Sequence, residues 1–184
     1  MQYESRSTYQ RIKVTALETT LRTEPYNLPT ITLSIDDLYL TRSDQVQLAT
    51  AHPENPLIQH RGEPSTHDVE LGVSLFRSLR NKEANIRIPF YDKSQHNGKG
   101  DRVPQDEWRL INANDDKKVE IVIFEGWCVG FRPLPDDELS EKWRNAVADD
   151  RAAGGKTGGQ LGKQRLQDVL FVNNALRQYD EMTE

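Results

Sequence analysis

Apolar residues recur three to four positions apart in several parts of the chain, which is the spacing of one face of a helix. This spacing predicts three amphipathic helices, over residues 14–23, 68–79 and 164–180. Two more polar segments are also expected to be helical: 43–52, with Ser43 as its N-cap, and 136–149. Residues 53–67, which contain three prolines and one glycine, are expected to form a long ordered loop.

Three runs of β-branched or apolar residues predict strands, over residues 30–35, 86–88 and 119–124. The last run, VEIVIF, gives the clearest signal and is typical of a strand buried on both faces. Strands of this kind alternating with helices favour an α/β fold with a parallel sheet. The length suits one domain over residues 1–184, and no internal repeat is visible.

Composition and charge exclude several classes of protein. Of the 184 residues, 35% are hydrophobic and 29% charged, so a packed core is expected. The net charge of −5 disfavours binding to nucleic acid or to a membrane surface. No run of about 18 apolar residues and no signal peptide is visible, so we expect no membrane span. The single cysteine, Cys128, fits a reducing compartment, so the expected location is the cytoplasm, with the nucleus also possible.

Acidic residues follow the two strongest predicted strands, at the sheet edge where α/β proteins bind ligands. Asp36 and Asp37 follow the strand at 30–35 and could supply a general base or a metal ligand. The alternative is an ordinary turn, because aspartate favours turns and caps. Glu125 closes the strand at 119–124 and resembles the Walker B carboxylate that meets a nucleotide's magnesium. The alternative is an exposed glutamate at a strand end.

Basic residues lie in two glycine-bearing loops, which suits a phosphate or carboxylate ligand. Arg61 precedes Gly62, and the second loop, YDKSQHNGKGDR, runs from Tyr91 to Arg102. The alternative is a solvated, charge-rich surface. His67 and Asp68 could contact a substrate, although Asp68 could equally be a helix N-cap. The four histidines have no metal-ligand spacing, so a zinc site is not expected.

Four sequence blocks follow one another between Ser34 and Leu134: SIDDLYLTRSDQ, NPLIQHRGEPSTHD, IPFYDKSQHNGKGDR and EIVIFEGWCVGFRPL. In this order they resemble the D-glycerate 3-kinase group of P-loop kinases, including the fungal ATP-dependent kinase of that type. They are more distantly similar to uridine kinases, phosphoribulokinases and pantothenate kinases. The resemblance covers about residues 14–180.

The resemblance implies a role for each matching residue. Asp36 falls at the family's catalytic base, and Glu125 would meet Mg²⁺, directly or through water. Substrate binding is implied for Tyr39, Arg61, His67, Asp68, Tyr91, Lys93 and Arg102. The implied reaction transfers the γ-phosphoryl group of ATP to a hydroxyl of a small acid, D-glycerate or a similar hydroxy acid. The alternative is a non-catalytic product that retains only the acceptor-side surface.

The sequence also departs from the family pattern. Family members have a first strand and a GxxGSGK[ST] loop before the helix at 14–23, whereas the first glycine here is Gly62. Gly155-Lys156-Thr157 is no substitute, because Asp150 stands where the pattern requires glycine and the stretch follows the Walker B strand. The family's WRxxQE-type stretch is absent as well. We therefore expect a fragment of a three-layer P-loop kinase, as from a truncated gene model or a pseudogene.

Overall fold

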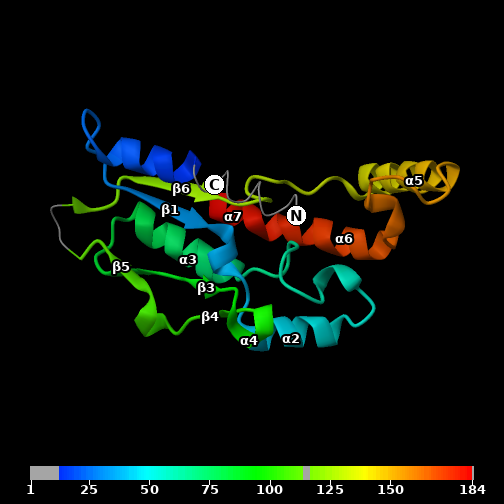
Figure 1. Cartoon of the computed structure of the whole chain (residues 1–184), viewed down its shortest axis with the longest axis horizontal. Coiled ribbons are helices and arrows are strands. Elements are labelled where there is room, and N and C mark those ends of the chain that lie inside the picture. The colour runs from blue at the N-terminus through cyan, green and yellow to red at the C-terminus, as the bar shows by residue number, and fades with distance from the viewer. Residues whose placement is uncertain (1–12, 114–116, 184) are drawn as a thin grey trace.

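The two predicted apolar strands pair with each other in a computed structural model, which describes residues 13–113 and 117–183 (Figure 1). Strand β1 (Thr30–Ser34) runs parallel to β6 (Ile121–Glu125), with Thr30 opposite Ile121 and Ser34 opposite Glu125. The predicted α/β fold with a parallel sheet is therefore confirmed. The first strand ends one residue earlier than predicted, because Ile35 begins the 3-10 helix η1 (Ile35–Leu38).

Helix α3 (Val69–Arg80) covers one face of this sheet. Leu75 and Leu79 pack against Ile31 and Leu33 of β1 in a buried apolar cluster that partly buried Phe124 also joins. Asp68 caps the helix, as expected, through a hydrogen bond from the Leu71 N–H to its Oδ1 at 3.0 Å. In Figure 1 the two strands lie between α3 and the helical residues 13–22.

The helix predicted at 43–52 forms as α2 (Arg42–Ala51), but Ser43 is not its cap. Thr41 caps it instead, because its Oγ1 accepts a hydrogen bond from the Asp44 N–H at 3.2 Å. Ser43 lies inside the helix at an exposed position. The expected loop that follows contains the short 3-10 helix η2 (Pro56–Ile58) and is otherwise irregular, and Ile58 is fully buried.

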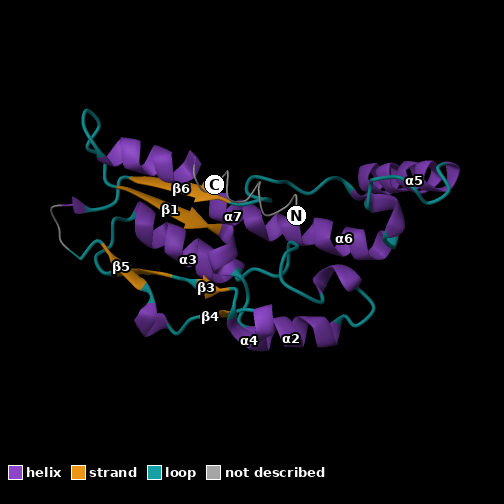
Figure 2. Ribbon diagram, in the orientation of Figure 1, coloured by secondary structure: helices purple, strands orange, loops and turns teal. Residues whose placement is uncertain are grey.

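Two further strand pairs were only partly predicted (Figure 2). Strand β2 (Ile86–Ile88) pairs in antiparallel fashion with β5 (Arg109–Ile111), which follows the 3-10 helix η3 (Gln105–Glu107). The expected polar loop forms a small hairpin, in which β3 (Tyr91–Asp92) pairs with β4 (Asp101–Arg102) around α4 (Gln95–Gly98).

The carboxyl-terminal part is helical. Helix α5 (Asp136–Ala152) projects away from the sheet in Figure 1 and is followed by the glycine-rich stretch and the 3-10 helix η5 (Leu161–Lys163). The helix predicted at 164–180 is divided into α6 (Leu166–Ala175), η6 (Leu176–Tyr179) and α7 (Asp180–Thr183). None of the helices in the described ranges is long and apolar enough to cross a bilayer.

A second buried cluster lies under η1. Ile35 and Leu38 pack against Cys128, Tyr179 and Met182. Ile35 and Leu38 point into this cluster, while Asp36 and Asp37 are only partly buried. The two carboxylates therefore lie at the carboxyl end of β1. The carboxyl-terminal helices thus hold the turn that carries the predicted base.

Candidate active site

Asp36 lies in the first turn of η1, immediately after β1. The turn is capped by Ser34, whose Oγ accepts from the Asp36 N–H at 3.4 Å. The Asp36 carboxylate is 2.5 Å from the ammonium of Lys93, which comes from the β3–β4 hairpin. The side chains of Asp36 and Lys93 are 31% and 50% exposed, so a small ligand can reach both groups.

A buried stack of rings lies beside Asp36. The ring of Tyr39 stacks on that of His67 with centroids 4.4 Å apart, and His67 Nδ1 is 2.7 Å from the Tyr179 hydroxyl. Burial lowers the pKa of His67 to about 4, against a smaller opposing effect of the Asp36 charge. Burial also raises the pKa of Tyr39, and the charge of Asp36 raises it further. At neutral pH this stack is therefore uncharged, and it gives one side of the site a fixed, apolar wall.

Arg102 joins the hairpin to the rest of the site. Its guanidinium donates to Asp68 Oδ2 at 2.9 Å and to the Tyr39 carbonyl at 2.8 Å. Only 10% of the side chain is exposed. The guanidinium thus fastens β4 both to the end of η1 and to the first turn of α3.

Arg61 and Tyr91 form the other side of the site. The Arg61 guanidinium donates to the carbonyls of Gly98, at 3.0 Å, and Lys99, and it lies 5.5 Å from the centre of the Tyr91 ring. The Tyr91 N–H donates to Asp37 Oδ1 at 3.1 Å. Asp37 therefore does more than form the expected turn, because it anchors the start of the hairpin.

Glu125 ends β6 directly opposite Ser34, so it lies at the same end of the two strands as Asp36. The next residue, Gly126, has φ +152°, and a Cβ there would be 2.2 Å from Ile35 Cγ2, which explains the need for glycine. Among residues 13–113 and 117–183, no group of three or more His, Cys, Asp or Glu side chains could hold a metal. A single carboxylate fits Mg²⁺ that takes its other ligands from substrate phosphates and water.

The structure brings the predicted residues into one group of contacts, with Glu125 on the neighbouring strand end. Sequence reasoning missed Tyr179, which lies 112 positions from its partner His67. It also missed Asp101, whose Oδ1 accepts from the Arg42 N–H at 2.8 Å. Gly155-Lys156-Thr157 lies in the loop after α5, where Lys163 donates to the Thr157 carbonyl, far along the chain from this group.

A parallel sheet that is covered by helices and carries carboxylates at the ends of adjacent strands is typical of α/β proteins that bind ligands at these strand ends. A solved D-glycerate 3-kinase from Cryptococcus neoformans var. grubii matches 89% of this chain, with a TM-score of 0.73 and 34% identity. This chain covers 53% of that structure.

Curated relatives carry kinase names. The chain is 44% identical over 131 residues to the uncharacterized kinase mug58 of Schizosaccharomyces pombe, a match that includes 71% of this chain and 46% of that protein. It is 37% identical over 109 residues to the chloroplastic D-glycerate 3-kinase of Arabidopsis thaliana, covering 58% of this chain and 23% of the relative. It is 39% identical over 106 residues to the probable ATP-dependent kinase TDA10 of Saccharomyces cerevisiae, covering 55% and 34%.

These similarities confirm the resemblance to kinases of the D-glycerate 3-kinase type. The chain spans less than half the length of the curated relatives it matches. No family model matches it.

Proposed function

We propose that this chain forms the acceptor side of an ATP-dependent kinase that phosphorylates a hydroxyl of a small acid, D-glycerate or a similar hydroxy acid. The observation that carries the proposal is the Asp36–Lys93 pair at the carboxyl end of β1, one strand away from Glu125. A partly exposed carboxylate at the end of a parallel strand can take a proton from an acceptor hydroxyl, and the neighbouring ammonium can hold negative charge on the acceptor. The names of two relatives as D-glycerate 3-kinases support the choice of acceptor.

In this proposal Asp36 takes the hydroxyl proton as the hydroxyl oxygen attacks the γ-phosphorus. Lys93 is within contact of Asp36 and half exposed, so it can neutralise the acceptor carboxylate or the transferred phosphoryl group. Arg61 is partly exposed and lies on the opposite side of the site, where a second carboxylate contact is available.

The other predicted residues have supporting roles. Arg102 is almost fully enclosed by Asp68 and the Tyr39 carbonyl, which favours positioning of the hairpin over direct contact with the acceptor. The rings of Tyr39, His67 and Tyr91 would form the wall against which the carbon chain of the acceptor rests. Glu125 would hold Mg²⁺, directly or through water, and the bound ion would offset the negative charge of the phosphates.

The nucleotide side of the reaction has fewer supporting residues. The 184 residues contain no GxxxxGK[ST] pattern, so this sequence does not supply the usual backbone cradle for ATP phosphates. This observation favours a second candidate function, a non-catalytic protein that keeps the acceptor-side surface.

A chimera tests the proposed function. Residues 14–180 would replace the matching segment of the Cryptococcus D-glycerate 3-kinase, and transfer of phosphate from ATP to D-glycerate would be measured. Turnover by the chimera supports the kinase assignment, whereas a folded chimera that binds Mg-ATP but phosphorylates no hydroxy acid contradicts it.

Calorimetry with Mg-ATP on the chain alone separates a kinase from a non-catalytic protein that keeps the acceptor-side surface. We expect millimolar binding or none, and micromolar binding would show that another segment holds the phosphates.

A further inference from the structure

A cavity lies at the amino ends of β1 and β6, opposite the strand ends that carry Asp36 and Glu125. It has a volume of about 650 Å³ and is bordered by the segment that enters β1, by β5 and by the segment that enters β6. Because the two strands enter the sheet here and leave it at the candidate active site, their length separates the two places. Five residues of strand correspond to roughly 17 Å. This cavity is therefore distinct from the acceptor site.

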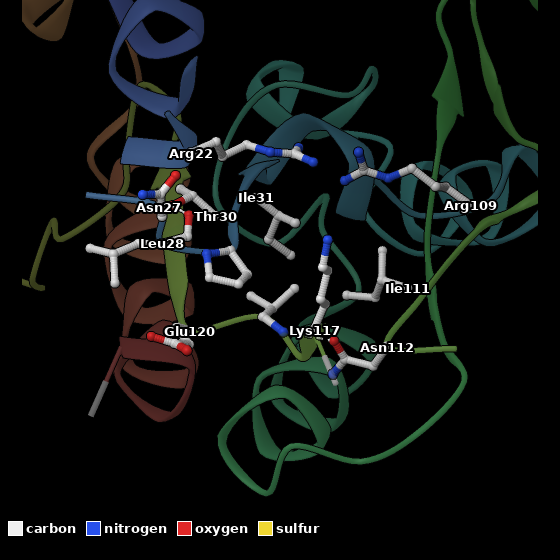
Figure 3. A pocket seen from close by; sticks show the side chains of 12 residues that line it. Arg22, Asn27, Leu28, Thr30, Ile31, Arg109, Ile111, Asn112, Lys117 and Glu120 are labelled. Carbon is white, nitrogen blue, oxygen red and sulfur yellow. Dashed lines mark hydrogen bonds between the residues drawn. The ribbon is translucent and has the colours of Figure 1, made fainter. Parts of the chain in front are cut away.

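Three cationic side chains from three parts of the chain project into this cavity. Figure 3 shows the guanidinium groups of Arg22 and Arg109 and the ammonium of Lys117 pointing toward one another, with the carboxylate of Glu120 turned away from them. Arg22 ends the helical residues 13–22, Arg109 belongs to β5, and Lys117 precedes β6. Residues far apart in the sequence thus contribute like charges to one space.

Among the described residues, few acidic side chains pair with these three cations. Arg22 pairs with Glu18, one helical turn earlier, at 3.2 Å, and 56% of the Arg22 side chain is exposed. Neither Arg109 nor Lys117 forms an ion pair with a described residue. Like charges that converge in this way repel one another, and a bound anion would remove that repulsion.

The rest of the cavity is suited to a carbon skeleton. Leu28 and Ile31 on one side and Ile111 on the other give it apolar walls, as Figure 3 shows. The volume lies within the range of cavities that hold small organic ligands, about 300–1,000 Å³. Guanidinium groups recognise phosphate oxygens in pairs, and the lysine adds a third, more mobile charge.

We propose that this cavity binds a small organic phosphate, with its phosphate group between Arg22, Arg109 and Lys117 and its carbon skeleton against Ile31 and Ile111. Such a ligand joins the amino-terminal helix, the β2–β5 pair and the start of β6, so its binding stabilises the sheet from the edge remote from catalysis.

The test uses inorganic pyrophosphate as the probe on the full chain, by calorimetry and thermal melting at constant ionic strength. We expect a dissociation constant below about 1 mM and a higher melting temperature in the presence of the probe. Arg109→Met and Lys117→Met should each weaken binding at least tenfold. Each should also leave the melting temperature without ligand unchanged or raised, because each relieves repulsion.

Two control variants make the result specific. Arg144→Met removes an exposed cation from α5, and Lys93→Met removes one from the acceptor site. Neither should change the affinity for pyrophosphate by more than twofold. The proposal is overturned if pyrophosphate does not bind, if Arg144→Met weakens binding as much as Arg109→Met, or if Lys93→Met alone abolishes it. None of these outcomes depends on whether the chain has kinase activity.

Discussion

His67 lies at the centre of a buried polar group that joins three distant parts of the chain. Its ring stacks on Tyr39 at the end of η1, its Nδ1 contacts the Tyr179 hydroxyl in η6, and the Ser65 N–H donates to that same hydroxyl at 3.1 Å. Its Nε2 is buried without a hydrogen-bond partner. A protonated His67 would therefore place an uncompensated charge in the interior.

The stability of the chain should depend on pH through His67. Its pKa is 6.5 when unperturbed and about 4 in the folded state, so between these values the unfolded chain binds a proton that the folded chain does not. The free energy of unfolding should therefore fall as the pH falls from 6.5 to 4, by up to about 3 kcal/mol. Urea unfolding at pH 7 and pH 4.5 measures this loss.

His67→Asn is the matched variant, because its amide can still reach the Tyr179 hydroxyl but does not titrate. The loss of stability on acidification should be smaller in the variant by most of that amount, even if the variant is less stable at pH 7. An equal loss in both proteins would mean that folding does not lower the pKa of His67 and would contradict its burial without a partner for Nε2.

Asp36 and Asp37 differ in what their carboxylates contact, which gives the second prediction. In the chimera, Asp36→Asn keeps the shape but removes the proton acceptor, so kcat should fall by about 10²–10⁴ with little change in ATP affinity. Asp37→Asn keeps an oxygen for the Tyr91 N–H and should cost less than about tenfold. Steady-state kinetics with D-glycerate and ATP measures both effects. A larger loss for Asp37→Asn would assign the base to Asp37, and small losses for both would contradict the mechanism.

The sequence indicated the residues of the candidate site through the order of its four blocks rather than through any one residue. An aspartate after a strand is as typical of a turn as of a general base, so Asp36 alone could not be assigned. The contact between His67 and Tyr179 left no sequence signal, because a pair separated by 112 positions follows no local spacing. The anchoring role of Asp37 was missed for the same reason, since Tyr91 is 54 positions away.

Among the elements, the β3–β4 hairpin contributes most to the candidate acceptor site. It supplies Lys93 and Tyr91, and it is held in place by Asp37, by Arg102 and by the hydrogen bonds of Arg61 to the carbonyls of Gly98 and Lys99. Strands of two residues are too short to show an alternating pattern, so the sequence indicated only a polar loop here. Longer elements with regular spacing, such as α3, were predicted nearly to the residue.

Gly100 and Gly98 provide a matched pair of tests for the hairpin. Both have positive φ, +76° and +85°, so alanine introduces similar backbone strain at either position. A Cβ at Gly100 would be 2.5 Å from Tyr91 Cε1 and 3.0 Å from Arg61 Nη1, whereas nothing lies within 4 Å at Gly98. Gly100→Ala should therefore displace Tyr91 and Arg61 as well as strain the chain.

In the chimera, Gly98→Ala should lower stability by about 1 kcal/mol and leave the KM for the acceptor unchanged. Gly100→Ala should lower stability further and raise that KM about tenfold, equivalent to 1.4 kcal/mol of lost binding. Thermal melting and kinetics with varied D-glycerate measure the two effects. Equal KM values in the two variants would show that Tyr91 and Arg61 do not contact the acceptor.

For the whole molecule, the parallel sheet described here consists of two strands, and every residue of β6 is partly exposed. Parallel sheets are normally buried on both faces. Spacing patterns predicted the elements, and the resemblance to P-loop kinases predicted that part of the sheet is missing, but neither predicted that β1 pairs directly with β6.

This exposed surface leads to the last prediction, which concerns the chain expressed alone. Open strand edges and exposed aromatic side chains such as Phe90, Trp127 and Phe131 favour self-association over a closed monomer. We expect the purified chain to bind the dye ANS, to associate at micromolar concentrations and to melt less sharply than the chimera, because the strand edges and these aromatic side chains stay exposed in its folded state. The chimera is the control, because it restores the kinase segments on either side of residues 14–180, and it should melt sharply without binding the dye. A sharp, cooperative melt of the chain alone, with dispersed amide NMR signals, would contradict this prediction and favour the non-catalytic function, because a chain that folds without a nucleotide-binding half is independent of it.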